Sequence, residues 1–348
     1  MTSHAIESIC LTNFTVFQKN EITFAKHINI ISGENGVGKT HLMKVLYSIG
    51  SSLQKTEEIS SKKLEENLAA KLVGVFRPDQ LGRLVKRKAG RHKASVEVKW
   101  CSGSTFTTTF ATSNSKSVSV ELNHPQQKWP TMVFIPVKEM ISATENFTGL
   151  YEEYHIAFEE TYYDLNKQLL LPLKRGPFVQ TQKELLSTLE RALSGQIIQE
   201  NNKFYLKQLG IGKLEMGLLA EGYRKIATIV QLIANGTIQE NTILFWDEPE
   251  SNINPKMIPI LSELFLQLAR LGVQLFISTH SYFLLQEMGL FTEYNNEEQL
   301  DIQFLSMHME EGVLNVETVS QLKDLQHNPI ADEFNRLYNR EQELFFND

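Results

Sequence analysis

Short, mostly apolar runs are the most regular feature of the chain, and a turn or loop follows each of them. INIIS (28–32), MVFIPV (132–137), ILFW (243–246) and VQLFIS (273–278) show no strict alternation of apolar and polar residues. Runs of this kind are typical of strands buried on both faces, as in a parallel sheet covered by helices. Segments with helical periodicity lie between the runs, so the pattern predicts an α/β fold with a central sheet.

Other segments alternate between apolar and polar residues. Residues 5–17 and 21–33 alternate as paired strands do, and we predict a turn between them at Gln18-Lys19-Asn20. Residues 94–122 are dense in Ser, Thr and Val and also alternate, which predicts an antiparallel hairpin or meander. From 141 to 207 the pattern is helical. We interpret this stretch as a helical insertion or lid.

The C-terminal third alternates helices and strands. The stretch LLAEGYRKIATIVQLIANG (218–236) predicts a helix closed by Asn235-Gly236. Two strand-like runs and a final helix (329–346) then follow within residues 281–348. We therefore expect one domain over residues 1–348, with a mixed central sheet, an antiparallel β lobe, the helical insertion, and 281–348 completing the main lobe.

Composition narrows the class of protein. The chain has 348 residues, is 42% hydrophobic and carries a formal charge of -7, which is ordinary for a globular protein and argues against a nucleic-acid coat over the whole surface. Cys10 and Cys101 lack metal-ligand spacing, so we expect two small buried residues and a reducing, cytoplasmic location. The apolar stretch 257–278 is interrupted by charged residues, so we expect no membrane span.

The first motif that carries chemistry follows the first buried strand. Gly33-Glu34-Asn35-Gly36-Val37-Gly38-Lys39-Thr40 matches GxxxxGK[ST], with a strand before it and a helix after it. Glycines let the backbone turn its N–H groups toward a phosphate, and the helix adds its positive N-terminal end. Lys39 would reach the β and γ phosphates, and the Thr40 hydroxyl would bind Mg²⁺. We count His41 among the nucleotide-binding residues as well.

Polar side chains follow two further buried strands. ILFW ends in Asp247-Glu248, where Asp247 is placed to hold Mg²⁺ beside Thr40. Glu248 can then face the γ-phosphate and activate water as a general base. VQLFISTH ends in His280, whose neutral imidazole can hydrogen-bond the γ-phosphate. We therefore expect Glu248, His280 and Lys39 to act in catalysis, with ATP and Mg²⁺ as the bound cofactors.

The order of the phosphate loop, LLAEGYRK, FWDEPESNINP and ISTH resembles the ATP-binding-cassette (ABC) ATPases. The similarity is to their soluble branch, which includes RecF-like and SMC-like proteins, OLD-family nucleases and the ATPases of anti-phage systems such as PARIS, Septu and retrons. In that family two protomers pack head to tail and complete each other's sites, so the resemblance implies an ABC-type fold and a homodimer. Onto this chain it maps Walker A at 33–40, Walker B at Asp247-Glu248, the D-loop at 251–255, the switch histidine at His280, and the signature loop at 219–223.

The signature loop departs from the family pattern. Ala220 stands where a serine is usual, and Glu221 replaces a glycine. Gly222 remains, and its backbone N–H can still meet the phosphate of the opposite protomer. Arg224 and Lys225 would supply positive charge in trans, or would simply solvate the helix. No glutamine is evident for the Q-loop, whose place residues 136–139 would take.

A basic stretch stands out in this otherwise acidic chain. Residues 76–94 contain eight basic or histidine side chains, most of them between 83 and 93. Residues 83–93 would contact a nucleic-acid backbone, bind an acidic protein, or form a solvated face. Few aromatic residues interleave with them, so base stacking is not supported.

Three functions are consistent with these features. The first is an ATPase that senses or regulates a separate effector, a nuclease or toxin, in an anti-phage system. The second is a DNA-repair ATPase of the RecF or SMC kind, and the third is an ATP-locked assembly scaffold with little turnover. A transporter subunit fits less well, because the signature loop is altered.

Overall fold

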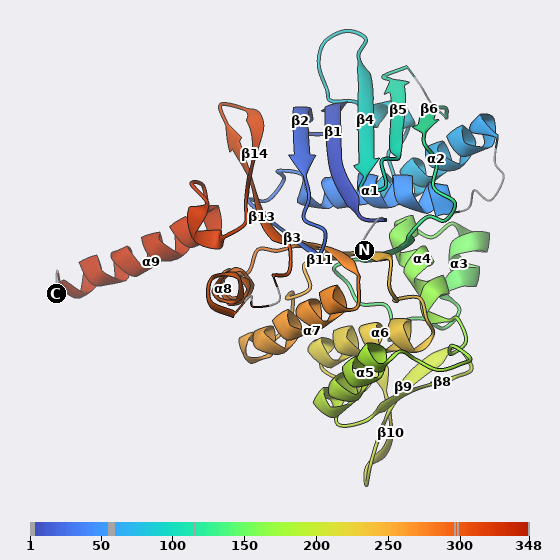
Figure 1. Ribbon diagram of the computed structural model, residues 1–348, viewed down its shortest axis with the longest axis vertical. Helices are drawn as coiled ribbons and strands as arrows, with labels where there is room; N and C mark the ends of the chain where they lie inside the picture. The colour runs from blue at the N-terminus through green and yellow to red at the C-terminus, as the bar shows by residue number, and fades with distance from the viewer. Residues whose placement is uncertain (1–3, 55–59, 114–115, 296, 298, 347–348) are drawn as a thin grey trace.

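The centre of the protein is a six-stranded sheet. The computed structural model describes residues 4–54, 60–113, 116–295, 297 and 299–346. The strands run in the order β14-β13-β3-β12-β11-β7, with β14 antiparallel and the others parallel (Figure 1). Their bounds are β3 Ile28–Gly33, β7 Thr131–Ile135, β11 Thr242–Asp247, β12 Gln274–Ser278, β13 Ile302–Glu310 and β14 Val313–Val319. The predicted α/β fold with a mixed sheet is confirmed.

The central strands are buried along their whole length, as their apolar runs predict. Every residue of β3, β11 and β12 is buried. In the parallel register Asp247 lies opposite Ser278, and Ser278 lies opposite Ile31. The carboxyl ends of these three strands therefore meet at one edge of the sheet, where ligands bind in folds of this type.

An antiparallel lobe covers one face of this sheet. Its strands run in the order β2-β1-β4-β5-β6, and the meander predicted for residues 94–122 forms β4 to β6. Helix α1 packs on the central sheet and α2 packs on α1 and β6, around a core that includes Tyr47, Phe245 and Phe276. The bounds are β1 Ile6–Phe14, β2 Phe17–Thr23, β4 Lys93–Trp100, β5 Thr105–Ala111, β6 Ser119–Asn123, α1 Lys39–Gln54 and α2 Ser61–Phe76.

The other face of the central sheet is covered mainly by helices. A second core joins α4 to α8 with the sheet and includes Trp246 and Phe265. A small sheet, β10-β9-β8, lies beside α5 and α6 (Figure 1). The bounds are α3 Phe147–Tyr154, α4 Glu160–Leu169, α5 Gln180–Leu193, β8 Gln196–Glu200, β9 Lys203–Gln208, β10 Gly212–Glu215, α6 Glu221–Ala234, α7 Ile258–Arg270 and α8 Tyr282–Leu290.

Two local predictions are wrong. Residues 18–20 lie inside β2, and the chain turns instead at Thr15-Val16, where Thr15 takes a φ of +48°. The helical insertion ends at Leu193, because residues 196–208 form β8 and β9 around Asn201-Asn202, both with positive φ. Two asparagines of this conformation make the short turn that a hairpin requires.

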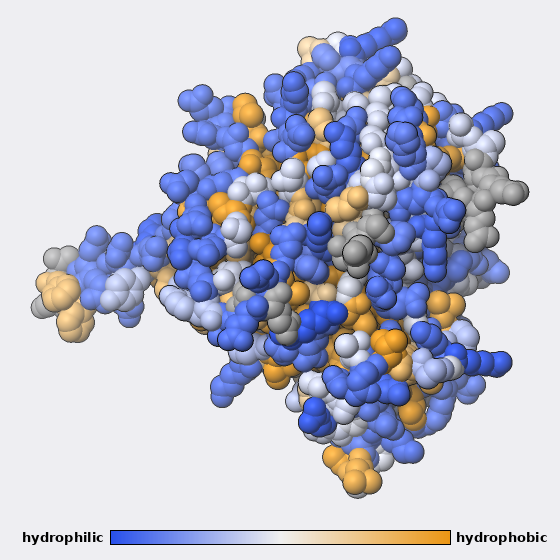
Figure 2. Space-filling view, viewed as in Figure 1, coloured by the Kyte–Doolittle hydropathy of each residue, from blue (hydrophilic) through white to orange (hydrophobic). Residues whose placement is uncertain are grey.

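The last helix leaves the body of the protein. Helix α9, Pro329–Phe346, has no buried residue and extends away from the two lobes (Figure 1). The surface in the same view is mostly hydrophilic, with apolar side chains at the far end of α9 and at the tip of the β9–β10 hairpin (Figure 2). Leu209 and Ile211 are the exposed residues at that tip. Among the described residues, no helix is both long and apolar enough to span a membrane.

Candidate functional site

The loop between β3 and α1 has the shape of a phosphate cradle. Gly33 has a φ of +141°, and a Cβ there would lie 2.1 Å from the carbonyl oxygen of Met307. Gly38 has a φ of +99°, and its Cβ would lie 2.5 Å from Val16. Both positions therefore require glycine, on conformational and on steric grounds. The loop backbone fits the phosphate group that its sequence predicts.

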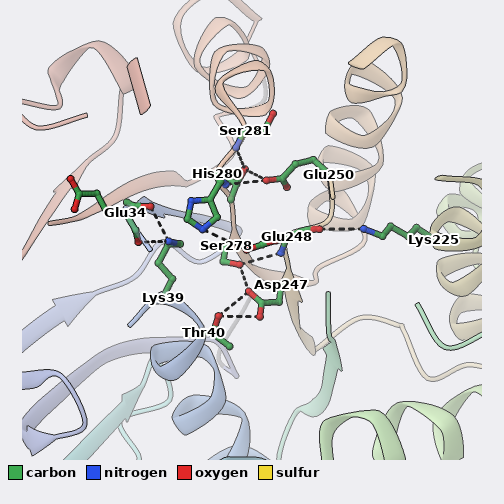
Figure 3. Close-up of polar contacts among 12 residues, drawn as sticks. Glu34, Lys39, Thr40, Lys225, Asp247, Glu248, Glu250, Ser278, His280 and Ser281 are labelled. Atoms are coloured by element: carbon green, nitrogen blue, oxygen red, sulfur yellow. Dashed lines mark hydrogen bonds and ion pairs between the residues drawn. The ribbon is translucent and has the colours of Figure 1, made fainter. Parts of the chain in front are cut away.

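Lys39 begins α1 and is buried beneath this loop. Its Nζ donates hydrogen bonds of 2.8 Å to the carbonyl oxygens of Gly33 and Glu34 (Figure 3). Burial lowers the pKa of Lys39 to about 8, although the carboxylates of Glu248 and Asp247 raise it. A desolvated ammonium in a water-poor loop gains strongly from a phosphate partner. This geometry suits the role expected for Lys39.

The next residue meets the second motif directly. Thr40 Oγ1 lies 3.0 Å and 3.2 Å from the two carboxylate oxygens of Asp247, and the Ser278 hydroxyl also donates to Asp247. Burial raises the pKa of Asp247, while the hydrogen bonds from Ser278 and Thr40 lower it. No cluster of three His, Cys, Asp or Glu side chains that would hold a metal occurs among the described residues. One hydroxyl and one carboxylate fit Mg²⁺, which keeps several waters and takes phosphate oxygens.

Glu248 and His280 face each other at the ends of neighbouring strands. Glu248 Oε1 lies 3.5 Å from His280 Nε2, and both side chains are about one-third exposed (Figure 3). Burial and the Lys39 charge lower the pKa of His280, so the imidazole is neutral near pH 7. Glu248 has a φ of +46°, and its backbone N–H bonds Ser278 at 3.2 Å. The predicted base and the predicted sensor are thus side by side.

Glu250 is a site residue to which the sequence analysis assigned no role. Its Oε1 accepts hydrogen bonds from the Thr279 hydroxyl at 2.6 Å and from the backbone N–H of His280 at 3.0 Å. Burial raises the pKa of Glu250, and these bonds lower it. The carboxylate therefore fixes Thr279 and His280, which we call the switch segment. The position of Glu250 close to Asp247 and Glu248 in the sequence indicates that it lies near the site. Its role depends on His280, which is 30 residues away in the sequence.

The segment after β7 reaches the same edge of the sheet. Residues 136–138, Thr40, Asp247 and residues from the start of α4 line a cavity of about 410 Å³. This places the segment expected to replace the Q-loop beside the proposed metal ligands. Its last residue, Glu139, makes an ion pair of 2.9 Å with Arg224.

Part of the basic stretch lines a cavity beside the phosphate loop. Arg83, Lys86, Arg87 and His41 share a space of about 490 Å³ with Phe76 and other residues. His41 lies against the Phe76 ring at a centroid distance of 5.5 Å, and burial lowers its pKa. The remaining basic residues of 83–93 lie mostly at the surface.

Helix α6 carries the predicted signature loop at its start. Ala220 is the N-cap and provides no side-chain cap, and Gly222 is buried in the first turn. Arg224 is paired with Glu139 within the protomer. For Lys225 both sequence-based alternatives are wrong, because its ammonium is buried against backbone oxygens of Glu248 to Ser251 and neither reaches outward nor solvates the helix.

Cys10 and Cys101 are free thiols and only partly buried, which differs from the full burial expected. Burial and nearby acids raise the pKa of both. Neither residue belongs to the site described above.

Comparisons with solved structures identify the fold. The chain is similar to an SMC head bound to the C-terminal winged-helix domain of ScpA, with a TM-score of 0.58, 13% identity, and coverage of 90% of this chain and 97% of the other. It is also similar to an SMC head with an extended coiled coil bound to the C-terminal domain of ScpA from Pyrococcus furiosus, with a TM-score of 0.51, 11% identity, and coverage of 97% and 99%. At these identities the similarity concerns the fold alone.

No curated protein matches the chain. A family of domains does match, over residues 28–286, which include the phosphate loop, the two carboxylates and His280. Its description is "AAA domain, putative AbiEii toxin, Type IV TA system". The match covers well over half of the 348 residues, and the chain therefore belongs to this AAA domain family.

Proposed function

We propose that this protein binds and hydrolyses ATP at a site completed by a second copy of the chain. The main evidence for hydrolysis is that Glu248 lies 3.5 Å from His280, beside the contact between Thr40 and Asp247. A carboxylate next to a neutral imidazole, at the edge where the phosphate loop lies, is suited to orient and deprotonate an attacking water.

The nucleotide and its metal would contact residues from three strand ends. The triphosphate would lie against residues 33–40, with Lys39 as its buried cation, and Mg²⁺ held by Thr40 and Asp247 would neutralise phosphate charge. The cavity beside His41 adjoins this loop and would accept the remainder of the nucleotide. ATP and Mg²⁺ are therefore the cofactors that these residues fit.

A second protomer would supply the missing contacts to the γ-phosphate. The first N–H groups of a helix have no intrahelical acceptor, and Ala220 gives α6 no side-chain cap. Gly222 and Arg224 at this end would meet the phosphate bound by the partner protomer, with Arg224 leaving its ion pair with Glu139. The resemblance of the motifs to ABC-type ATPases supports this arrangement.

The substitution Glu248→Gln tests both parts of the proposal. It should abolish turnover and accumulate an ATP-bound dimer, measured by phosphate release and by light scattering after size exclusion. Glu153→Gln, at an exposed glutamate of α3, is the matched control. Wild-type turnover in Glu248→Gln would refute the base assignment. Lost turnover in a protein that stays monomeric with ATP would refute only the shared site.

The nucleotide cycle would control a separate effector, a nuclease or toxin, in an anti-phage system. The family description, which names a putative toxin, and the motif resemblance support this role. The test is co-expression with the adjacent genes, comparing the wild type with Lys39→Ala. The proposal requires that Lys39→Ala change the toxicity of a neighbouring gene product or remove protection against phage. Equal behaviour of both proteins would contradict it.

Nucleic-acid binding is a second candidate, favoured by the exposed side chains of Lys88, Arg91 and Lys93. Reversing these three charges should weaken DNA binding and reduce its dependence on salt, because phosphate contacts release counterions. Fluorescence anisotropy with duplex DNA at two salt concentrations measures both, and reversal of the exposed Lys183 is the control. Unchanged binding would exclude this face as a DNA site.

The ATP-locked scaffold is a third candidate. It would be favoured if the wild type binds ATP and shows little turnover.

A further inference from the structure

The ammonium of Lys225 is enclosed by the turn that follows β11. Only 3% of this residue is exposed, although it carries a charge. Its Nζ donates to the carbonyl and hydroxyl oxygens of Ser251 at 2.7 Å and 2.8 Å. The carbonyl oxygen of Pro249 lies at 3.2 Å from it. That of Glu248 lies at 3.3 Å (Figure 3). One cation therefore binds the backbone of the catalytic turn from Glu248 to Ser251.

This turn has an unusual backbone that needs such a partner. Glu248 has a φ of +46°, a conformation that residues other than glycine and asparagine adopt only when their surroundings hold them there. The conformation directs several carbonyl oxygens toward one buried point. A buried carbonyl requires a donor, and Lys225 supplies it to three residues at once.

Lys225 also connects this turn to the start of α6. One turn earlier, a Cβ on Gly222 would lie 2.9 Å from Met257 Sδ and 3.7 Å from Ile253, so the helix start is packed on the segment after the turn. Helix α6 thus touches this region at two successive levels. These contacts give a shift of its N-terminal end a direct route to the backbone that carries Glu248.

We propose that Lys225 is a positioning residue for hydrolysis, which links the phosphate-facing end of α6 to Glu248 of the same protomer. This inference builds on the proposed function. When a second protomer's nucleotide binds the start of α6, Lys225 transmits the shift to the turn and aligns Glu248 in its own site. Each protomer would thereby sense occupation of the partner's site.

Lys225→Met tests the link, because it keeps the length of the side chain and removes the cation. We expect turnover at saturating ATP to fall roughly 10- to 100-fold, the scale of a displaced catalytic group. The KM and the affinity for ATP should remain within about twofold of wild type, since Lys225 contacts no residue of the phosphate loop. Lys225→Arg, which can also donate to several oxygens, should recover part of the rate. Lys256→Met, at an exposed lysine just after the turn, is the control.

A milder change covers the case in which Lys225→Met is unstable. Ser251→Ala removes one of the partners of Lys225 and keeps the carbonyl. It should lower turnover by a few fold in the wild-type background and cause no further loss in the Lys225→Met background, because both changes break the same link. Additive losses, or normal turnover in Lys225→Met and Ser251→Ala, would overturn the proposal.

Mixed dimers distinguish action within a protomer from action across the interface. A Glu248→Gln protomer mixed with Lys225→Met keeps ATP in both sites and leaves one intact Glu248, which belongs to the protomer without Lys225. We expect no recovery of turnover if Lys225 acts on its own Glu248. Recovery would show that Lys225 acts in trans and would overturn the proposal.

Dimerisation separates failure of this inference from failure of the shared site. Glu248→Gln should form an ATP-bound dimer, measured by light scattering after size exclusion. If it stays monomeric with ATP, the shared site is wrong, and the kinetic split in Lys225→Met alone then decides whether Lys225 positions Glu248.

Discussion

Glu250 offers the sharpest test of how the switch segment is held. Its carboxylate accepts hydrogen bonds from the Thr279 hydroxyl at 2.6 Å and from the His280 N–H at 3.0 Å. Bonds to a charged acceptor contribute about 1.5–3 kcal/mol each, and bonds to a neutral one about 0.5–1.5 kcal/mol. Glu250→Gln keeps an acceptor oxygen, so we expect a loss of about 1–1.5 kcal/mol per bond, or about 2–3 kcal/mol for the two, roughly thirty- to 150-fold in turnover.

Glu250→Ala removes the acceptor and releases the His280 backbone. If His280 hydrogen-bonds the γ-phosphate in the transition state, loss of that contact costs about 10²- to 10³-fold in turnover. Glu250→Ala should therefore approach the rate of His280→Ala. The decisive protein is the double variant Glu250→Ala/His280→Ala. It should be no slower than His280→Ala alone, because Glu250 acts only through His280.

The assay is phosphate release at saturating ATP for the wild type, the three single variants and the double variant. Glu343→Ala, at an exposed glutamate of α9, controls for the loss of one negative charge. Equal losses from Glu250→Ala with and without His280 would refute the reasoning. That result would assign Glu250 to electrostatic support of Lys39 instead, since its charge also raises the pKa of that lysine.

Three other outcomes follow from buried or paired charges. The affinity for ATP should be highest well below pH 8 and should fall as the pH rises through the Lys39 pKa of about 8, because phosphate binds the ammonium form. Above pH ~9 the fall should approach about tenfold per pH unit. Calorimetry measures this slope, and the affinity of Lys39→Met should not change over the same pH range. Lys71→Met should lower the free energy of unfolding by about 3–5 kcal/mol, since it removes a buried cation and leaves the partly buried carboxylates of Glu160 and Asp164 without it. Urea melts measure this, and a loss below about 1 kcal/mol would show that water already screens them. Arg224→Ala should slow turnover by roughly tenfold or more, whereas unchanged turnover would leave Arg224 only its ion pair with Glu139.

The parts of the fold that the sequence predicted are those set by local pattern. Apolar runs such as 243–246 identify strands buried on both faces, and the glycines of 33–38 identify a loop with positive φ. The wrong turn at 18–20 has a physical cause. The true turn at Thr15-Val16 contains neither glycine nor asparagine, so composition favoured the polar residues that follow. Asn201-Asn202, by contrast, is a pair that favours a hairpin turn, although the pattern of the surrounding stretch predicts helices.

The candidate site was predictable where its residues belong to recognisable motifs at the ends of buried strands. Thr40 and Asp247 were expected to be close, and they are in hydrogen-bond contact. Lys225 and Glu250 were misjudged or missed because their partners lie on other elements, 26 and 30 residues away. A buried lysine and an outward-reaching lysine have the same local pattern. The difference depends on how α6 packs against the turn after β11.

The bonding of this turn explains why the site would need a second protomer. The backbone of Glu248 is held from two sides, by Ser278 of β12 and by Lys225 of α6. Its carboxylate, in contrast, has His280 as a partner at 3.5 Å and is about one-third exposed. The backbone of Glu248 is thus fixed, while its carboxylate can still turn. Glu248 is therefore a base that is positioned but not yet oriented toward its water. Helix α6 contacts the same turn, so a phosphate bound at the start of α6 would orient the Glu248 carboxylate. Nucleotide in one site would thereby orient the catalytic base of the other site.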